Sequence, residues 1–493
     1  MEMEYVKPRI GIYTVGLHAY WEQFNGLKER IVSYNRFIEE KLSEDAEVYN
    51  FGLVDSVELG RQAGEYFNKN NVDLIFLHSG TYATSSIVLP VHQRCQARTI
   101  ILSLQPTPQI EYDQTDTGEW LAQCVACPVP EFTNAFNRSK IPFTVISGLL
   151  GLETQGTSAI CNEITNERPE AKRAWNEINE WILAAKVKRN IQNSTFGFLG
   201  NTYNGMLDMY SDFTMVQAQT GIHIEVLEMC DLAAFLETVT STEIGEKYKQ
   251  LQEMFIISED SPTDKLARKP TEEQLLWACK VAAAQQKLVE NLDALVYYYH
   301  GAHGNEYEAL QSGFIFGHFL LTANHIPCAG EGDLKTAIAM KICDILEVGG
   351  SYSEIVAADY NFGTILFGHD GPFHLQIADG KPILRGMGLY HGKQGSGVSV
   401  EAKVRTGEIT ALGVTQTNEG ILKLIISEGN SIDGPIMKIG NTQTHVKFNK
   451  QPDLYMERWF NEAPTHHCAI SIGHNASVLE KTANLLNISY STL

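Results

Sequence analysis

The sequence lacks a long apolar run, an apolar leader and an excess of basic charge. No segment approaches the about eighteen apolar residues that a membrane-spanning helix needs, so we expect no membrane span. The acidic start Met1-Glu2-Met3-Glu4 is followed by no apolar stretch, so we expect neither a signal nor a transit peptide. Lys and Arg number 38 against 59 Asp and Glu, a net charge of -21, which disfavours nucleic acid as a partner.

Cysteines are few and follow no pairing pattern. The nine cysteines are odd in number and scattered in apolar contexts, which is typical of free thiols in a reducing cytoplasm. Cys124 and Cys127 form a C-x-x-C motif with no second pair, so the spacing alone predicts neither a zinc site nor a redox centre. We therefore expect a cytoplasmic protein.

The pattern of apolar segments predicts an α/β protein of several domains. Continuous apolar strands alternate with helical segments up to about residue 346, which is typical of doubly wound parallel sheets. The expected elements include strands at 9–15, 72–77, 99–104, 143–147 and 195–200 and a helix from about 307 to 323. After residue 347, short alternating segments separated by turn residues predict antiparallel strands. The expected domains are 1–188 and 189–346, both Rossmann-like, and 347–493, β-rich and barrel-like. Expected strands after residue 347 include 364–367, 373–378, 397–404, 409–416, 422–428 and 434–439.

Ligand-facing groups of parallel sheets lie beyond the carboxyl ends of the strands. The segment after the expected strand 9–15 contains His18 and Trp21, which are candidates for substrate contact. The glycine-rich segment 391–397 precedes a strand and no helix, so we interpret it as a turn and not as a phosphate-binding loop.

The stretch 329–374 contains several polar residues at the edges of expected elements. Glu331 follows a short strand, and Asp333 is a candidate N-cap for the helix after it. Glu354 follows the Gly349-Gly350 pair in a polar segment, and His369 follows the strand 364–367.

A fourth polar residue of this kind, His467, comes before an apolar strand about a hundred residues later. Two carboxylates and two imidazoles are a workable ligand set for one divalent metal. Such a centre suits proton abstraction beside a carbonyl, through an ene-diol of an α-hydroxy aldehyde. Imidazole ligands favour Mn²⁺ over Mg²⁺, and Co²⁺ or Zn²⁺ would also bind.

Three blocks in this order resemble the L-arabinose isomerase and L-fucose isomerase superfamily: Ala329 to Asp333, Phe367 to His369 and Thr465 to His467. The resemblance implies two α/β domains, a β-rich C-terminal domain and an Mn²⁺ centre. The implied ligands are Glu331, Glu354, His369 and His467, and the two glutamates are the implied proton-transfer groups. It also implies a homotrimer or homohexamer, in which His18 or Trp21 of a neighbouring subunit completes each sugar pocket.

The chain departs from the arabinose enzymes at Leu334, where they usually have Trp, and at Asp370, where a Met-Leu-Glu run is usual. It therefore resembles a divergent branch of isomerase-like proteins, and the sugar stays open. Asp359 competes with Glu354 for the second carboxylate ligand. Glu308 and His466 are further candidates for sugar contact. The alternatives are a sugar-binding or regulatory protein without turnover, and a sugar epimerase that uses the same metal site.

Overall fold

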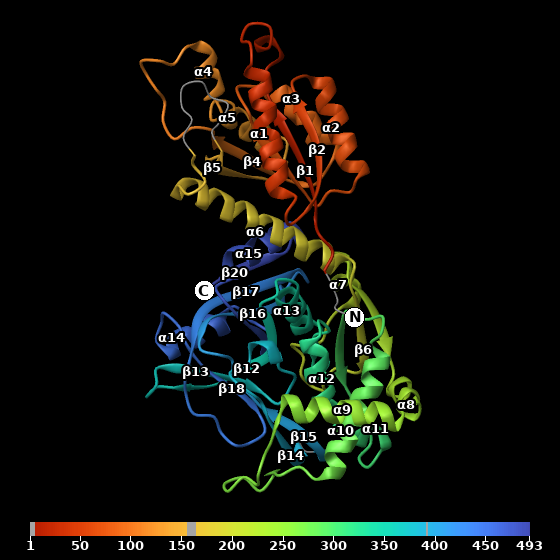
Figure 1. Ribbon diagram of the computed structural model, residues 1–493. Helices are drawn as coiled ribbons and strands as arrows, with labels where there is room; N and C mark the ends of the chain where they lie inside the picture. Colours follow the sequence, from red (N-terminus) through yellow and green to blue (C-terminus); the bar gives the residue numbers. More distant parts are fainter. Residues whose placement is uncertain (1–4, 155–163, 391–392) are drawn as a thin grey trace. The chain divides into compact units, whose positions relative to one another are not determined.

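The computed structural model describes residues 5–154, 164–390 and 393–493. They form two compact units, one from Val6 to Arg189 and the other from Asn190 to Leu493 together with Tyr5. The elements of each unit are labelled in Figure 1. Within the described ranges, none of the helices combines the length and the apolar character needed to cross a membrane.

The first unit is built on a five-stranded parallel sheet with the order β2-β1-β3-β4-β5. The strands are β1 (Arg9–Val15), β2 (Glu47–Val54), β3 (Leu74–Ser79), β4 (Arg98–Gln105) and β5 (Phe143–Leu149). Four of them lie where the apolar runs predicted strands. The edge strand β2 was not predicted, because most of its side chains are only half-buried and it has no continuous apolar run.

Helices cover both faces of this sheet. Successive side chains of a strand point to opposite faces. Tyr13 of β1 packs in a buried cluster with α2 (Val57–Lys69), α3 (Ser85–Arg94) and α5 (Val129–Arg138). The next residue, Thr14, faces the other side and accepts a hydrogen bond from Asn35 of α1 (Leu27–Leu42) at 2.9 Å. The remaining helical elements of this unit are η1 (His18–Tyr20), α4 (Thr117–Ala122) and α6 (Pro169–Gln192).

The second unit begins with a four-stranded parallel sheet of the order β11-β10-β6-β7. Its strands are β6 (Thr195–Gly200), β7 (His223–Leu227), β10 (Ala294–Tyr298) and β11 (Cys328–Ala329). The helices that follow these strands are α7 (Phe213–Thr220), α8 (Met229–Glu237), α9 (Ser241–Met254), α10 (Glu272–Leu288), α11 (Glu306–Ser312), α12 (Phe314–Ala323) and α13 (Leu334–Ile345). The carboxyl ends of β6, β10 and β11 meet at one edge of the sheet.

A closed antiparallel barrel of six strands follows in the same unit (Figure 1). Its order is β16-β19-β12-β13-β18-β17, and pairing between β16 and β17 closes it. The strands are β12 (Gly349–Asp359), β13 (Thr364–His369), β16 (Gly407–Gln416), β17 (Leu422–Ile432), β18 (Thr442–Lys447) and β19 (His467–Ile472), with β20 (Ser489–Thr492) added parallel to β17. Two helices, α14 (Pro452–Asn461) and α15 (Ala476–Leu486), belong to this part of the chain.

A smaller sheet joins β14 (Ile383–Tyr390) to β15 (Lys393–Glu401), β8 (Ile256–Ile257) and β9 (Ala267–Arg268). The turn expected at 391–397 falls partly on His391 and Gly392, which lie outside the described residues. Two strands predicted after residue 347 were wrong. Residues 373–378 contain the short helix η2 (Leu375–Ile377) instead of a strand, and 434–439 lie in no described strand.

Candidate metal centre

Glu331 occupies a tight turn between β11 and α13, at the carboxyl edge of the parallel sheet. Its φ of 58° lies in the left-handed region that a residue with a side chain rarely adopts. Gly332 follows with a φ of 77°, and a Cβ there would lie 2.4 Å from Thr202 Cα, so only glycine fits. Tyr203 N donates to Glu331 O at 2.8 Å. This turn holds the Glu331 side chain in a fixed, buried position, 7% exposed.

The barrel supplies three further predicted residues from neighbouring strands. Glu354 of β12 pairs with His467 of β19 on one side and with Gly368 of β13 on the other. His369 is the last residue of β13 and directly follows Gly368. The expectation that Glu354 stands at the edge of an element was wrong, since it lies within the long strand β12. Strand register therefore brings together residues that are about a hundred positions apart in sequence.

Five side chains form two overlapping groups that could hold a metal ion. One group is Glu331, His466 and His467, and the other is Glu354, His369 and His467. Within each group, the candidate donor atoms all lie within 4.8 Å of one another. The Nε2 atoms of His369, His466 and His467 lie 3.9, 3.8 and 3.7 Å from carboxylate oxygens of Glu331. Donors about 2.1 Å from a shared ion stand up to about 4.2 Å apart, so these separations suit one ion.

His467, which belongs to both groups, is fixed in the form that a metal needs. Its side chain is 0% exposed, and Nδ1 lies 3.0 Å from Asp333 Oδ2 and 2.6 Å from the Tyr352 hydroxyl. A carboxylate only accepts, so Nδ1 donates its proton to Asp333 and leaves the lone pair on Nε2. Nε2 is buried and has no hydrogen-bond partner among the described residues. A buried nitrogen of this kind is what a metal ligand requires.

The charges around His467 favour the neutral imidazole. Burial lowers the pKa of His467 below its usual value, against the opposing hydrogen bond to Asp333. Burial acts to raise the pKa of Asp333, but its hydrogen bonds with His467 and Thr336 lower it below the usual value. Asp333 therefore stays ionised, and its side chain also accepts from Thr336 N at 3.0 Å as the N-cap of α13.

His466 is held from both sides by acidic groups. Its Nδ1 lies 2.6 Å from Asp208 Oδ2, which also accepts from His466 N at 3.0 Å, and Nε2 faces Glu331. Burial acts to lower the pKa of His466, but the contacts with Glu331 and Asp208 raise it to about 9. Burial acts to raise the pKa of Glu331, and the hydrogen bond with His466 then lowers it below the usual value. Glu331 is therefore ionised.

His369 has an acidic neighbour of its own. Nδ1 lies 2.8 Å from Asp370 Oδ1 and 2.7 Å from Gly371 N. Burial acts to lower the pKa of His369, but the Asp370 carboxylate raises it above the usual value. The Tyr352 ring lies edge-on to the His369 ring, with the centroids 4.8 Å apart. Asp370 and Tyr352 therefore support the imidazole from outside the ligand set.

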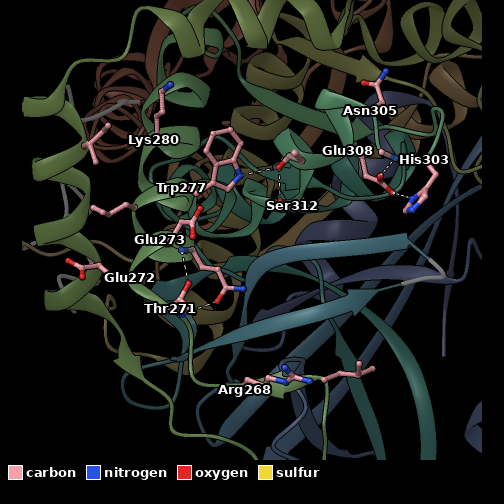
Figure 2. Close-up of a pocket in the computed structure, with 16 residues that line it drawn as sticks. Arg268, Thr271, Glu272, Glu273, Trp277, Lys280, His303, Asn305, Glu308 and Ser312 are labelled. Atoms are coloured by element: carbon pink, nitrogen blue, oxygen red, sulfur yellow. Dashed lines mark hydrogen bonds and ion pairs between the residues drawn. The ribbon is translucent and has the colours of Figure 1, made fainter.

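Two other candidate residues, Asp359 and Glu308, lie elsewhere. Asp359, the rival of Glu354, is the last residue of β12, where its Oδ1 accepts from Asn361 N and Phe362 N. Glu308 accepts from Gly304 N at 2.7 Å and lines a separate pocket of about 1290 Å³. Figure 2 shows Glu308 beside His303 in that pocket. Neither the residues that line this pocket nor those that bond to Asp359 include a member of the two candidate metal-ligand groups.

His18 and Trp21 belong to the first unit. Both approach Asp55, which follows β2: His18 Nδ1 lies 3.4 Å from Asp55 Oδ2, and Trp21 Nε1 donates to the same oxygen at 2.7 Å. The side chains from the ends of β1 and β2 thus meet at the carboxyl edge of the five-stranded sheet, as expected for a parallel sheet.

Sequence reasoning missed four residues that shape the centre: Asp208, Tyr352 and Asp370, and Asp333 in its contact with His467. Tyr352 had a usable signal, because residues two apart in a strand share a face and Glu354 is two positions later. Asp208 had none, since 258 residues separate it from His466.

No protein-family model matches the chain, and no curated protein matches it either. The functional argument therefore depends on the residues themselves.

Proposed function

We propose that this chain is a metal-dependent isomerase that interconverts an aldose and a ketose, with Mn²⁺ as the expected ion and Mg²⁺ or Co²⁺ as substitutes. The expected substrate is a pentose or hexose such as L-arabinose or L-fucose. The observation that carries the proposal is that the group with Glu331 and the group with Glu354 and His369 share His467, whose buried Nε2 has no hydrogen-bond partner among the described residues. The strand order β2-β1-β3-β4-β5 supports a doubly wound first domain within this proposal.

A bound divalent ion would polarise the carbonyl and neighbouring hydroxyl oxygens of the sugar and stabilise the negative charge of the ene-diol. Glu331 and Glu354 come from different parts of the unit, one from the parallel-sheet edge and one from the barrel. One carboxylate would take the proton from C2 of the aldose, and the proton would return to C1 of the ketose. The hydroxyl proton at O2 would move to O1 in the same exchange, so the overall change is an isomerisation without an added reductant.

His466 is placed to assist this exchange. It is the most exposed member of the two groups, with 36% of its side chain accessible, and it carries a proton at neutral pH. Its Nε2 could donate to a sugar oxygen beside Glu331. Asp208 keeps the ring in that orientation through the ring and backbone N–H groups.

The proposal includes a cytoplasmic homotrimer or homohexamer. In that assembly, His18 or Trp21 of a neighbouring subunit would complete the sugar pocket. Their position at a strand end supports a role in recognition, because the His18 side chain is 78% exposed and its Nε2 could contact a sugar hydroxyl while Nδ1 faces Asp55. Light scattering on the purified protein measures the subunit number directly.

The deciding experiment incubates metal-stripped protein with Mn²⁺, Mg²⁺ or Co²⁺ and a panel of pentoses and hexoses, and measures ketose formation. Glu331→Gln and Glu354→Gln are compared with Asp359→Asn, which changes the carboxylate at the last residue of β12. We expect Mn²⁺-dependent turnover that both glutamine variants abolish and Asp359→Asn retains. An epimer in place of a ketose would favour the epimerase, and metal binding without turnover of any sugar would favour the sugar-binding protein.

A further inference from the structure

The C-x-x-C motif lies on the first unit, apart from the proposed metal chemistry. Cys124 and Cys127 occupy the short connection between α4 and α5, and both are free thiols. The side chain of Cys124 is buried, and that of Cys127 is exposed. Cys127 stands directly before Pro128, the N-cap of α5. One thiol is therefore accessible to solvent, and its partner three residues earlier is protected.

The protein holds the connection between the two helices in place. Ser79 at the end of β3 donates from its hydroxyl to Val125 O at 2.6 Å, and Thr81 donates to Leu121 O at 2.7 Å. Cys124 N donates to Leu121 O at 3.1 Å, which turns the chain after α4. The Cys124 and Cys127 side chains share a hydrogen bond. The two side chains therefore lie close together on a connection that Ser79 and Thr81 hold in place.

We propose that Cys124 and Cys127 form a reversible dithiol–disulfide site, which reacts with low-molecular-weight disulfides. Neither cysteine packs as an isolated core residue, and the spacing of the pair matches that of known dithiol motifs. The sequence motif had no second pair to suggest chemistry. The difference in exposure and the contact between the thiols indicate dithiol chemistry for the pair.

The difference in exposure sets the order of the reaction. Burial, and next the hydrogen bond with Cys127, raise the pKa of the Cys124 thiol to about 12, so Cys124 is a poor first nucleophile. The accessible Cys127 thiolate attacks one sulfur of the small disulfide, and one thiol leaves. Cys124 then loses its proton and attacks the Cys127 sulfur, and the second thiol leaves. The two cysteines lose two electrons and two protons, and the small disulfide is reduced to two thiols.

The site is next to the edge where β1 and β3 end. Tyr20 of η1 packs against the buried cluster that contains Leu121 and Ala122 of α4. The Tyr82 hydroxyl donates to Glu131 in α5 at 3.3 Å. Oxidation would therefore fix the α4–α5 connection beside η1, the element that contains His18.

The test uses the full chain with Cys230→Ser and Cys161→Ser, because Cys230 is exposed and Cys161 lies outside the described residues. This background is treated with glutathione disulfide and mapped by peptide mass spectrometry. We expect a Cys124–Cys127 disulfide with the loss of two hydrogens, and its full reversal by dithiothreitol. Adding Cys124→Ser should trap a glutathionyl group on Cys127, and adding Cys127→Ser should abolish the reaction.

A second measurement keeps both Cys124 and Cys127, so its result does not depend on whether a variant of either cysteine folds. We expect the equilibrium constant for disulfide formation to be at least about tenfold higher in the folded background than in urea, about 30 mV in reduction potential. Equal constants in the folded and unfolded chain would overturn the proposal. A glutathionyl group that persists on Cys127 while Cys124 is still present would overturn it as well.

Discussion

Replacing Asp333 by Asn should weaken metal binding while α13 stays capped. Asp333 Oδ1 accepts from Thr336 N at 3.0 Å, and asparagine keeps an acceptor at that position. Asp333 Oδ2 is the atom that meets His467 Nδ1 at 3.0 Å. Asparagine would place an NH₂ group there, which donates and does not accept. The His467 ring would then move its proton to Nε2, and Nε2 would have no lone pair for a cation.

The expected loss follows from this change of tautomer. Loss of such an outer hydrogen-bond partner reduces metal affinity about 10- to 100-fold, about 1.4–2.7 kcal/mol. The Thr336 hydroxyl lies 2.7 Å from Oδ2 and can rotate to accept from the new amide, so Thr336 loses no hydrogen bond. The substitution then changes only the hydrogen bond to His467. Calorimetric titration of the metal-stripped protein with Mn²⁺ measures the affinity. Nitrogen NMR of labelled imidazole rings reports which nitrogen carries the proton.

Asp359→Asn is the matched control, because it makes the same chemical change at the end of β12, at a residue outside the candidate metal-ligand groups. Asp359 Oδ1 accepts two backbone hydrogen bonds, and asparagine can keep both. We expect its Mn²⁺ affinity to equal that of the wild-type chain. If Asp333→Asn also binds Mn²⁺ with wild-type affinity, or if Nδ1 of His467 keeps its proton, the reasoning about the tautomer is refuted.

Three further predictions concern stability. Arg30 Nη1 lies 2.6 Å from Glu119 Oε2 in a buried pair, so Arg30→Met should lower the free energy of unfolding of the first unit by about 3–5 kcal/mol in urea titrations. The hydrogen bond with Asp344 raises the pKa of His325 in the folded protein, so the protonated His325 stabilises the fold. This contribution is complete below about pH 6.5 and is lost as the pH rises through the pKa of His325 in the folded protein. His325→Gln should flatten the stability curve there; an unchanged curve would contradict this. Gly80→Ala would bring a Cβ within 2.4 Å of a side-chain carbon of α1 and should lower stability by about 1–3 kcal/mol, read from thermal unfolding.

The sequence predicted those elements whose burial is uniform. β1 and β6 have the bounds that their apolar runs indicated, because central parallel strands are covered on both faces. The edge strand β2 mixes polar and apolar side chains, so it has no run to detect. The single helix expected over 307–323 is interrupted at Gly313, where a Cβ would lie 2.7 Å from Val281 Cγ2. The break between α11 and α12 depends on tertiary packing against α10, which the local sequence pattern does not reveal.

The candidate centre was predictable to the extent that its residues stand at element edges. Glu331 follows the short strand β11 and His369 ends β13, each beside a glycine, and this local signal is visible in the sequence. The pairing of Glu354 with His467 depends on the register of β12 and β19, which a single sequence does not specify. The contact between Asp208 and His466 depends on tertiary folding in the same way. The ligand types were therefore readable from the sequence, and their supporting partners were not.

A last prediction concerns which part of the chain binds the metal. Glu331 comes from the parallel-sheet edge and His467 from the barrel, and both belong to the unit Asn190–Leu493. A fragment of residues 190–493 should bind Mn²⁺ with the affinity of the full chain, as measured by calorimetry. A shorter fragment of residues 190–346 should not bind it. The longer fragment lacks Tyr5, whose hydroxyl accepts from buried Lys341 at 3.0 Å, so its melting temperature should fall even while its affinity is retained. Mn²⁺ binding by the 190–346 fragment alone would show that the barrel residues are not ligands.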